Sequence, residues 1–386
     1  MAVLWASRVT YLLILIFNLS TWIDLIGIWT ELPLIVAHLP EGWTLPSIIS
    51  MITCLSNIYP LIIIVIRCIR GSKNFSEIPH IYAVIFIGIG GCMVLGLFWH
   101  KTFYLFHQQR SVIFLVATFF LSMLDCSSSL IYFDYMKRFR PKYLNAMFFG
   151  EGLTGLIPAL IAFAQGIGGE ITCESGHKPS YSRPRFSVKI YFFILAALIT
   201  CSLFAFILLQ WTSIAQSGDA LEKRDETMII EDQNVKQVFI VKPVTTLVTR
   251  NYISKTNYYF LLILNTINAL IVYGCLPSLI TYAVLPYGQR AFYYCSVLAP
   301  LTFPLACFLN LVLKSKLRLI IVCSFISTAG ILFIFYIAFN SPCPILHDTT
   351  KGAILVTVIW CTISFSSAYI RVRIGNIIKT SWSNEN

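Results

Sequence analysis

Long apolar stretches limit what this chain can fold into more than any other feature of its sequence. Ten segments each hold roughly twenty mostly apolar residues, the number that a helix needs to cross a hydrocarbon layer about 30 Å thick. They cover residues 11–36, 45–66, 78–98, 111–133, 144–166, 187–210, 257–284, 291–313, 317–339 and 350–370. Charged residues make up 12% of the chain, about half of their share in soluble domains. The sequence therefore predicts an all-α polytopic membrane protein with ten transmembrane helices.

The predicted helices fall into two groups. Residues 1–210 form an N-terminal half with six helices, and residues 257–386 form a C-terminal half with four helices and a short tail. Residues 211–256 mix acidic and basic side chains without a long apolar run, which indicates a cytoplasmic linker. Two helical halves joined in this way are typical of secondary transporters.

Lysine and arginine are distributed unevenly between the two sides of the predicted membrane. Alternate loops, beginning with the N-terminus, hold 20 of the 28 basic residues. Because cytoplasmic loops carry such an excess, we expect both termini to lie in the cytoplasm. The net charge of +11 is then mainly an orientation signal, and we expect membrane lipids but no nucleic acid as surroundings and partners.

Four acidic residues fall inside predicted helices, and an ionised group at that depth costs several kcal/mol unless it has a function or a partner. They are Asp24, Glu31, Asp125 and Glu151. Burial disfavours the charged form of a carboxyl group, so Asp24, Asp125 and Glu151 are candidates for protonation. We expect Asp125 and Glu151 to face a cavity between the halves, although a structural hydrogen-bonding role for each carboxyl group is an equal alternative.

The first predicted helix contains further polar and irregular features. Gly27 and Pro33 predict an irregular or broken helix, and the break places Glu31 and Trp29 near the outer mouth. The candidate substrate-binding residues of the whole chain are Trp22, Trp29, Glu31, Asp125, Ser128, Glu151, Asn268 and Tyr282. Aromatic residues at helix ends also form interfacial belts, and polar residues also join helices to one another, so each position has a structural alternative.

Several function classes lack their characteristic residues in this sequence. No lysine or arginine lies deep in a predicted helix to hold a phosphate, and no Walker A sequence is present for ATP hydrolysis. No paired Cys-x-x-Cys or Cys–His pattern is present, so we expect no metal site, no cofactor and no enzyme activity. Cys173 and Cys343 fall in outer loops, where a disulfide bond between them is feasible.

Seven short stretches of the sequence form a recognisable set. They are GIWTELPLIV and LPEGWTLPS within 27–47, TFFLSMLDCSSS at 118–129, FFGEGLTGLIPALIAFAQG at 148–166, LPYG at 285–288, PLACF at 304–308 and SPCP at 341–344. Together they resemble the eukaryotic riboflavin transporter family, whose members are plasma-membrane solute carriers. The resemblance implies facilitative or secondary transport of riboflavin across the plasma membrane by alternating access, without ATP hydrolysis. It also implies a fold similar to the equilibrative nucleoside transporters, with eleven helices.

The chain has ten predicted helices where this family has eleven. The last predicted helix carries several hydroxyl groups, at Thr357, Thr362, Ser364, Ser366 and Ser367. We expect either that the chain is less stable in the membrane than an eleven-helix relative or that another chain covers this face. Two alternatives to riboflavin transport stay open: a nucleoside-like or other vitamin carrier on the same fold, and a polytopic receptor or isoform that transports nothing. Riboflavin itself suits the sequence, because its flat rings stack on aromatic residues and its ribityl chain needs hydroxyl partners.

Overall fold

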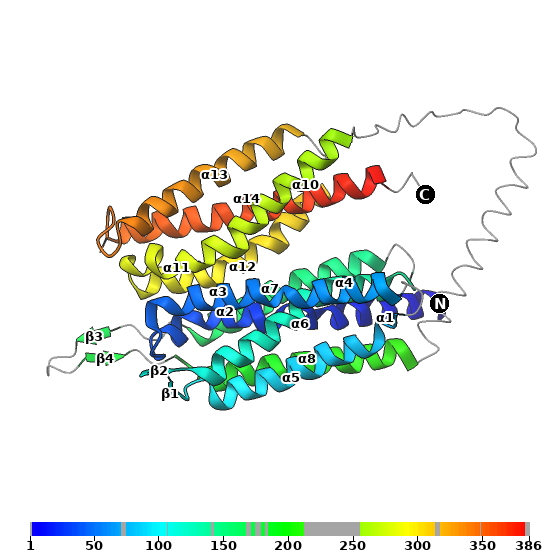
Figure 1. The fold of residues 1–386 in the computed structure, drawn as a ribbon, viewed down its shortest axis with the longest axis horizontal. Helices are drawn as coiled ribbons and strands as arrows, with labels where there is room; N and C mark the ends of the chain where they lie inside the picture. Colours follow the sequence, from blue (N-terminus) through cyan, green and yellow to red (C-terminus); the bar gives the residue numbers. More distant parts are fainter. Residues whose placement is uncertain are drawn as a thin grey trace, which may run out of the picture.

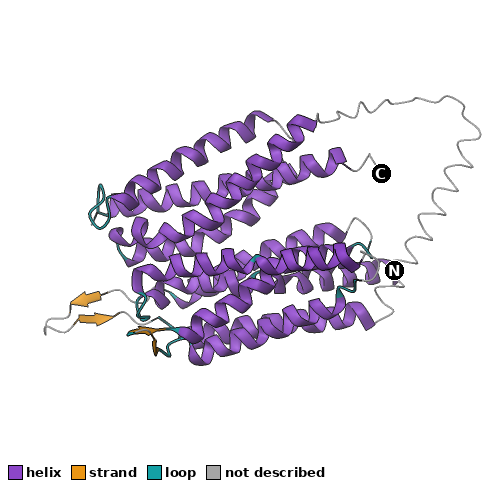
Figure 2. Ribbon diagram, in the orientation of Figure 1, coloured by secondary structure: helices purple, strands orange, loops and turns teal. Residues whose placement is uncertain are grey.

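The computed structural model describes residues 2–70, 75–105, 107–139, 143–166, 171–173, 179–181, 184–211, 255–312, 317–347 and 349–382. These residues form two groups of helices that lie against each other (Figure 1). Two short β-hairpins project from one end of the molecule, which we call the hairpin end (Figure 2). Helix α1 begins and helix α14 ends at the opposite end, which we call the termini end (Figure 1). The predicted linker falls almost wholly outside the described residues.

The first group contains all helices before residue 212. They are α1 (Ala2–Phe17), the 3₁₀ turn η1 (Asn18–Thr21), α2 (Ile23–Val36), the 3₁₀ turn η2 (Gly42–Thr44), α3 (Leu45–Ser56), α4 (Ile58–Arg70), α5 (Ile78–Phe98), α6 (Val112–Met136), α7 (Leu144–Gln165) and α8 (Val188–Trp211). The hairpins pair β1 (Phe103–Leu105) with β2 (Gln108–Arg110) and β3 (Ile171–Cys173) with β4 (Pro179–Tyr181), both antiparallel.

The second group follows residue 254. It contains α10 (Lys255–Ala269), the π-helical turn η5 (Leu270–Cys275), α11 (Leu276–Val284), the 3₁₀ turn η6 (Leu285–Tyr287), α12 (Gln289–Val312), α13 (Leu317–Phe339) and α14 (Thr350–Trp382). Among the described residues, nine helical segments are long and apolar enough to cross a membrane, and the bent pair α1–α2 makes a tenth. The predicted all-helical, ten-span membrane protein is confirmed, whereas the likeness to nucleoside transporters stays a prediction.

The first span bends at a different place from the one that the sequence suggested. Its two parts meet at an angle of 53° at Trp22, and Gly27 and Pro33 both lie inside α2. Three side chains before the bend donate to backbone carbonyl groups: Asn18 to Ile14, Ser20 to Phe17 and Thr21 to Asn18, each at 2.8 Å. Such local bonds compete with regular helical geometry, which explains why the helix breaks after this run.

The last helix is longer than predicted. Helix α14 continues twelve residues beyond the predicted end at Ile370, and the segment that passes the membrane-span test reaches Gly375. Arg371 and Arg373, which were expected in the cytoplasmic tail, are therefore part of this helix. Both guanidinium groups lie over aromatic rings, Arg371 over Tyr273 and Arg373 over Tyr369, and these contacts let α14 continue as a packed helix.

Two predictions concern contacts at the edges of the fold. Cys343 is a free, exposed thiol in the loop between α13 and α14, and the disulfide bond with Cys173 stays a prediction. Cys173 ends β3, which projects from the other helix group, and its side chain lies outside the described residues (Figure 1). Four hydroxyl groups of α14 already bond within the chain, those of Thr357, Thr362, Ser364 and Ser367. A partner chain on this face stays a prediction.

Aromatic rings form the centre of the first group. The ring of Phe17 stacks on Tyr132 of α6 with centroids 4.3 Å apart and on Phe206 of α8 with centroids 5.1 Å apart. All three side chains are fully buried. This stack joins α1, α6 and α8, and it fixes the position of the bend that follows Phe17.

Helix α7 approaches α1 so closely that only glycine fits at one position. A Cβ atom on Gly150 would lie 2.5 Å from the carbonyl oxygen of Leu15 and 2.9 Å from the Cβ of Asn18. We predict that Gly150→Ala forces the two helices apart and destabilises the protein by about 1–3 kcal/mol, as overpacking does elsewhere. The measurement is the melting temperature of purified protein in detergent.

Gly90→Ala is the matched control, because a Cβ atom at Gly90 in α5 would meet nothing within 4 Å. This variant should melt at the wild-type temperature or slightly above it, since alanine favours a helix over glycine. Equal melting temperatures for the two variants would contradict the close approach of α7 to α1.

Candidate functional site

The two helix groups touch through hydrogen bonds close to the hairpin end. In each of them a side chain of one group donates to a backbone carbonyl group of the other. The pairs are Ser47 to Ser278 (2.7 Å), Ser50 to Gly274 (2.7 Å), Thr281 to Trp43 (2.6 Å), Gln289 to Pro33 (2.6 Å) and Tyr293 to Ala162 (2.7 Å). These residues belong to α2, η2, α3 and α7 of the first group and to η5, α11 and α12 of the second.

Midway along the molecule the groups meet through backbone packing. A Cβ atom on Gly155 of α7 would lie 2.7 Å from the carbonyl oxygen of Pro300 in α12, and one on Gly152 would lie 3.8 Å from Pro304. These two glycines therefore allow α7 and α12 to pack closely against each other. The prolines interrupt the hydrogen-bond ladder of α12, so the contact occurs where that helix bends most readily.

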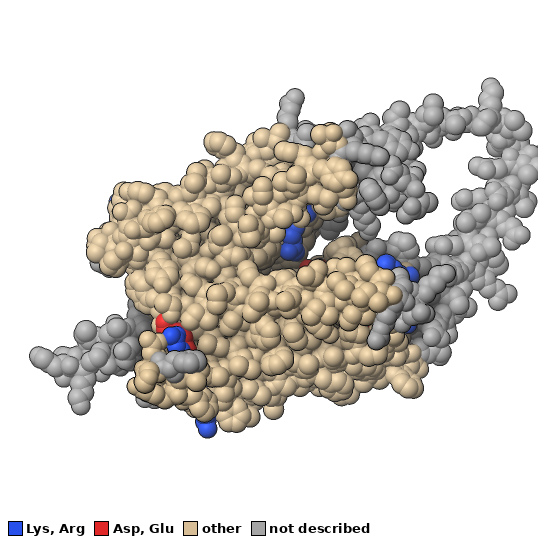
Figure 3. Space-filling view, in the orientation of Figure 1, with Lys and Arg blue, Asp and Glu red and all other residues tan. Residues whose placement is uncertain are grey.

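Beyond this contact the surface between the groups is hollowed. Figure 3 shows a hollow between the two groups with basic and acidic side chains on its walls. Glu151 of α7 and Arg371 of α14 face each other across the two groups, with Oε1 and Nη2 3.9 Å apart. Their side chains are 20% and 35% exposed, respectively. Of the acidic residues predicted inside helices, Glu151 is therefore the one that faces the opposite group.

Arg371 is the functional candidate that the sequence reasoning missed. Its Nη1 donates to the hydroxyl group of Tyr273 at 2.7 Å, and its guanidinium carbon lies 4.8 Å from the ring centroid of Phe303. The sequence placed Arg371 just after the last span, whereas in the structure it lies near the end of the segment Thr350–Gly375 that passes the membrane-span test. A helix that continues past a basic residue leaves no local signal in the sequence, because the same residue also marks the cytoplasmic end of a span.

Asp24 and Asp125 form a carboxyl pair inside the first group. Their carboxyl groups lie within hydrogen-bonding reach of each other, and the Oδ1 of Asp24 also accepts from the backbone N–H of Leu25 at 2.9 Å. Two carboxylates have only acceptors, so a bond between them requires at least one shared proton. Asp125 belongs to α6 and is 1% exposed, and Asp24 belongs to α2. It does not face the hollow, contrary to our expectation.

The pair belongs to a polar cluster around the bend of the first span. Ser128 donates to the carbonyl oxygen of Thr21 at 3.2 Å, and the Nε1 of Trp22 donates to Ser129 at 3.4 Å. Four candidates from the sequence, Trp22, Asp24, Asp125 and Ser128, therefore come together here. Their partners are one another, the backbone and the Ser129 hydroxyl group. The Oδ2 of Asp125 is buried without a hydrogen-bond partner in the described part of the chain.

Glu31 has a different environment from the one predicted. It is 1% exposed, and the Nε2 of Gln165 donates to its Oε1 at 2.8 Å and also to the carbonyl oxygen of Phe186 at 3.1 Å. Glu31 therefore does not line an open mouth, because α7 and α8 cover it. Trp29 is half-buried against the apolar core.

The two remaining candidates lie apart from these clusters. Tyr282 of α11 packs edge-on against Trp43, with centroids 6.2 Å apart, near the hairpin end. The Nδ2 of Asn268 donates to the carbonyl oxygen of Ser367 at 3.3 Å, so it joins α10 to α14. Asn268 lies just before the π-helical turn η5, a geometry that is frequent at functional sites.

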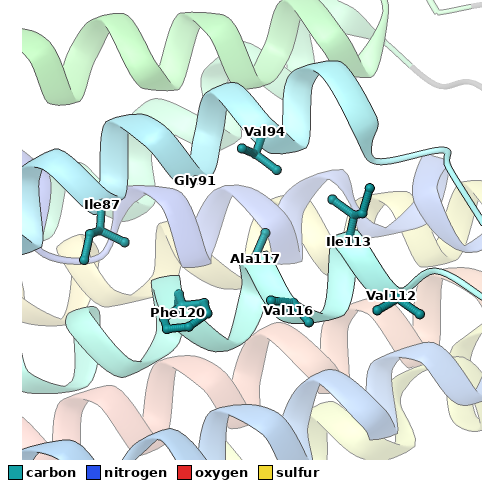
Figure 4. A pocket seen from close by; sticks show the side chains of 8 residues that line it. All are labelled: Ile87, Gly91, Val94, Val112, Ile113, Val116, Ala117 and Phe120. Carbon is teal, nitrogen blue, oxygen red and sulfur yellow. The ribbon is translucent and has the colours of Figure 1, made fainter.

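A second concave feature lies outside the space between the groups. It is a groove of about 400 Å³ between α5 and α6, lined by side chains such as Ile87, Val94, Val116 and Phe120 (Figure 4). The lining offers no hydrogen-bonding side chain, so it cannot orient a polar solute. Among the described residues no three His, Cys, Asp or Glu side chains gather closely enough to hold a metal ion.

The carboxyl pair predicts different outcomes for two substitutions of Asp125. Asn has an amide that can donate to Asp24, so Asp125→Asn should keep the bond and leave the melting temperature nearly unchanged. Asp125→Leu leaves Asp24 buried beside an apolar side chain, and it should destabilise the protein by about 1–3 kcal/mol. Thermal melting of both purified variants measures the difference, and a neutral Leu variant would exclude the pair as a structural element.

Comparison with known proteins places these features in a family. A sequence model described as solute carrier family 52, riboflavin transporter, matches residues 6–385. The chain is 30% identical over 413 residues to riboflavin transporter 2 of Salmo salar, with 97% of this chain and 90% of the relative covered. It is 31% identical over 400 residues to riboflavin transporter member 3-A of Danio rerio, with 94% and 87% covered.

A human relative is more distant but equally well covered. Solute carrier family 52, riboflavin transporter, member 3 of Homo sapiens is 28% identical over 421 residues, with 96% of this chain and 89% of that protein covered. The match is to transporters rather than enzymes and extends over nearly the whole sequence, so the chain belongs to solute carrier family 52, the riboflavin transporters.

Proposed function

We propose that this chain carries riboflavin across the plasma membrane by alternating access of its two helix groups, without ATP hydrolysis. The observation that carries the proposal is the family match over residues 6–385, together with relatives that are named riboflavin transporters along nearly their whole length. These names favour riboflavin over the nucleoside-like carrier, the other vitamin carrier and the non-transporting receptor that the sequence left open.

The hollow between the groups has chemistry that suits a flavin. Riboflavin has a planar three-ring system, an imide edge and a ribityl chain, which need ring faces, charged or amide partners and hydroxyl partners. Tyr273 and Phe303 supply aromatic rings beside the hollow, and Glu151 and Arg371 supply an acceptor and donors. Of the substrate-binding residues proposed from the sequence, we retain Glu151 as the one that contacts riboflavin.

The contacts between the groups support an alternating mechanism. The hydrogen bonds near the hairpin end close that side, while the hollow lies farther toward the termini end. Each bond joins a neutral side chain to a backbone carbonyl group, and such bonds contribute only about 0.5–1.5 kcal/mol. An interface built from them can separate and re-form, as rigid-body rocking of two groups requires. Protonation of Asp24, Asp125 or Glu151 during the cycle stays part of the proposal.

We further propose that the termini end faces the cytoplasm. The excess of basic residues in alternate loops supports this orientation. The hairpin end, closed in this structure, would then face outward, and the hollow would be reached from the cytoplasm. Riboflavin would enter when the contacts of α3 with α11 and of α2 with α12 separate.

Uptake of labelled riboflavin tests the function. Cells that express the chain should accumulate it in a saturable manner, and unlabelled riboflavin should abolish the labelled signal whereas uridine should not. Effective competition by uridine would indicate the nucleoside-like carrier. Absence of uptake at normal surface expression would favour the non-transporting receptor.

Epitope tags test the orientation. Tags fused before Met1 and after Asn386 should stain only permeabilised cells, and a tag inserted between β1 and β2 should stain intact cells. The physical reason is that an even number of spans returns the chain to its starting side. Staining of either terminal tag on intact cells would refute the proposed orientation.

A further inference from the structure

The cation in the hollow is held by contacts that leave part of it accessible. Arg371 bonds to the Tyr273 hydroxyl group and lies 5.5 Å from the Tyr273 ring centroid and 4.8 Å from that of Phe303. These contacts fix the plane of the guanidinium group. The side chain is still 35% exposed, and a guanidinium group has five N–H donors. Donors that the tyrosine does not use are therefore available to the hollow or to Glu151.

Glu151 balances this charge from the opposite group. Its carboxylate lies 3.9 Å from the Nη2 of Arg371 and is itself 20% exposed. The glutamate sits between Gly150 and Gly152, and the packing of Gly150 against Leu15 and of Gly152 against Pro304 holds this turn of α7 close to both neighbouring helices. The pair presents a net charge of zero to a solute in the hollow.

A solute with a phosphate group would meet this pair differently from a neutral solute. Arginine binds phosphate through two parallel hydrogen bonds, so Arg371 alone would attract a phosphate ester. The Glu151 carboxylate already neutralises the charge of Arg371, and it repels a second anion, such as a phosphate group, at short range. A neutral flavin experiences neither the attraction nor the repulsion, because it carries no formal charge.

We propose that Glu151 is a specificity-determining residue that neutralises Arg371 and thereby excludes flavins esterified with phosphate. The inference rests on the proposed function, since it assumes that a flavin occupies the hollow. In this inference the two residues act together. Arg371 supplies hydrogen-bond donors to the substrate, and the charge of Glu151 makes these donors available to uncharged substrates but not to phosphate esters.

The test measures binding rather than transport, so a variant that no longer moves substrate can still be scored. Riboflavin and riboflavin 5′-phosphate are both fluorescent, and quenching on the purified full-length protein gives a Kd for each. The readout is the ratio of the Kd of the phosphate ester to the Kd of riboflavin. In Glu151→Gln this ratio should fall about tenfold or more, which is the contribution of one hydrogen bond to a charged group. This fall in the ratio should become smaller at high ionic strength, because salt screens the attraction between Arg371 and the phosphate group.

Three further variants separate the pair from other effects. Arg371→Gln leaves an unbalanced carboxylate and should raise the ratio above the wild-type value. The double variant Glu151→Gln/Arg371→Gln removes both charges and should return the ratio toward that of the wild type. Glu77→Gln is the matched control, because Glu77 also pairs with an arginine, Arg138 at 2.8 Å, but lies before α5, away from the hollow. Its ratio should not change.

The outcomes distinguish this inference from the proposed function. If the wild type binds riboflavin and Glu151→Gln leaves the ratio unchanged, the inference is wrong while the function stands. A lowered ratio that persists in the double variant would also overturn it, because Arg371 would then not be the phosphate ligand. If the wild type binds neither flavin, the proposed function fails and the inference fails with it.

Discussion

Polar groups inside hydrocarbon must find partners within the chain, and this constraint shapes most of the structure. Hydroxyl groups meet it locally: Thr30 donates to the carbonyl oxygens of Ile26 and Gly27, and Ser56 donates to that of Ile52. Where several such bonds follow one another, as before Trp22, the helix gives up its regular geometry. The same requirement that keeps most spans straight therefore also produces the bend in the first one.

Carboxyl groups also need partners within the chain, and the location of the partner decides whether the contact stabilises one helix group or joins the two groups. Asp24 and Asp125 lie within hydrogen-bonding reach of each other, and Glu31 accepts from Gln165. Glu41 accepts from the backbone N–H and hydroxyl group of Ser111, so it caps the first turn of α6. These carboxyl groups are buried within one helix group and stabilise it. An acid whose partner lies on the other group differs from these, because its contact changes directly when the groups move.

Glu151 has such a partner, which is why the site is assigned to the space between the groups. Its contact with Arg371 joins α7 to α14, and the bonds near the hairpin end join α2, α3 and α7 to α11 and α12. The first contact involves charges beside an open surface, whereas the others involve neutral side chains and backbone. A solute in the hollow would therefore change the first contact directly and the others only through movement of the helices.

The sequence by itself determined the number of spans, most of their limits and the family, because apolar run length and short motifs are local properties of a chain. Helix α5 begins and ends where the apolar run does, at residues 78 and 98. The sequence also identified the four intramembrane acids, because an acidic residue within an apolar run can be recognised from its neighbours in the chain alone. Tertiary structure alone decided which acid faces the hollow, because Glu31 and Gln165 are 134 residues apart and Glu151 and Arg371 lie on different groups. The continuation of α14 past Arg371 was likewise decided by Tyr273 and Phe303, rings on distant helices that stabilise a cation where the sequence predicted the end of a span.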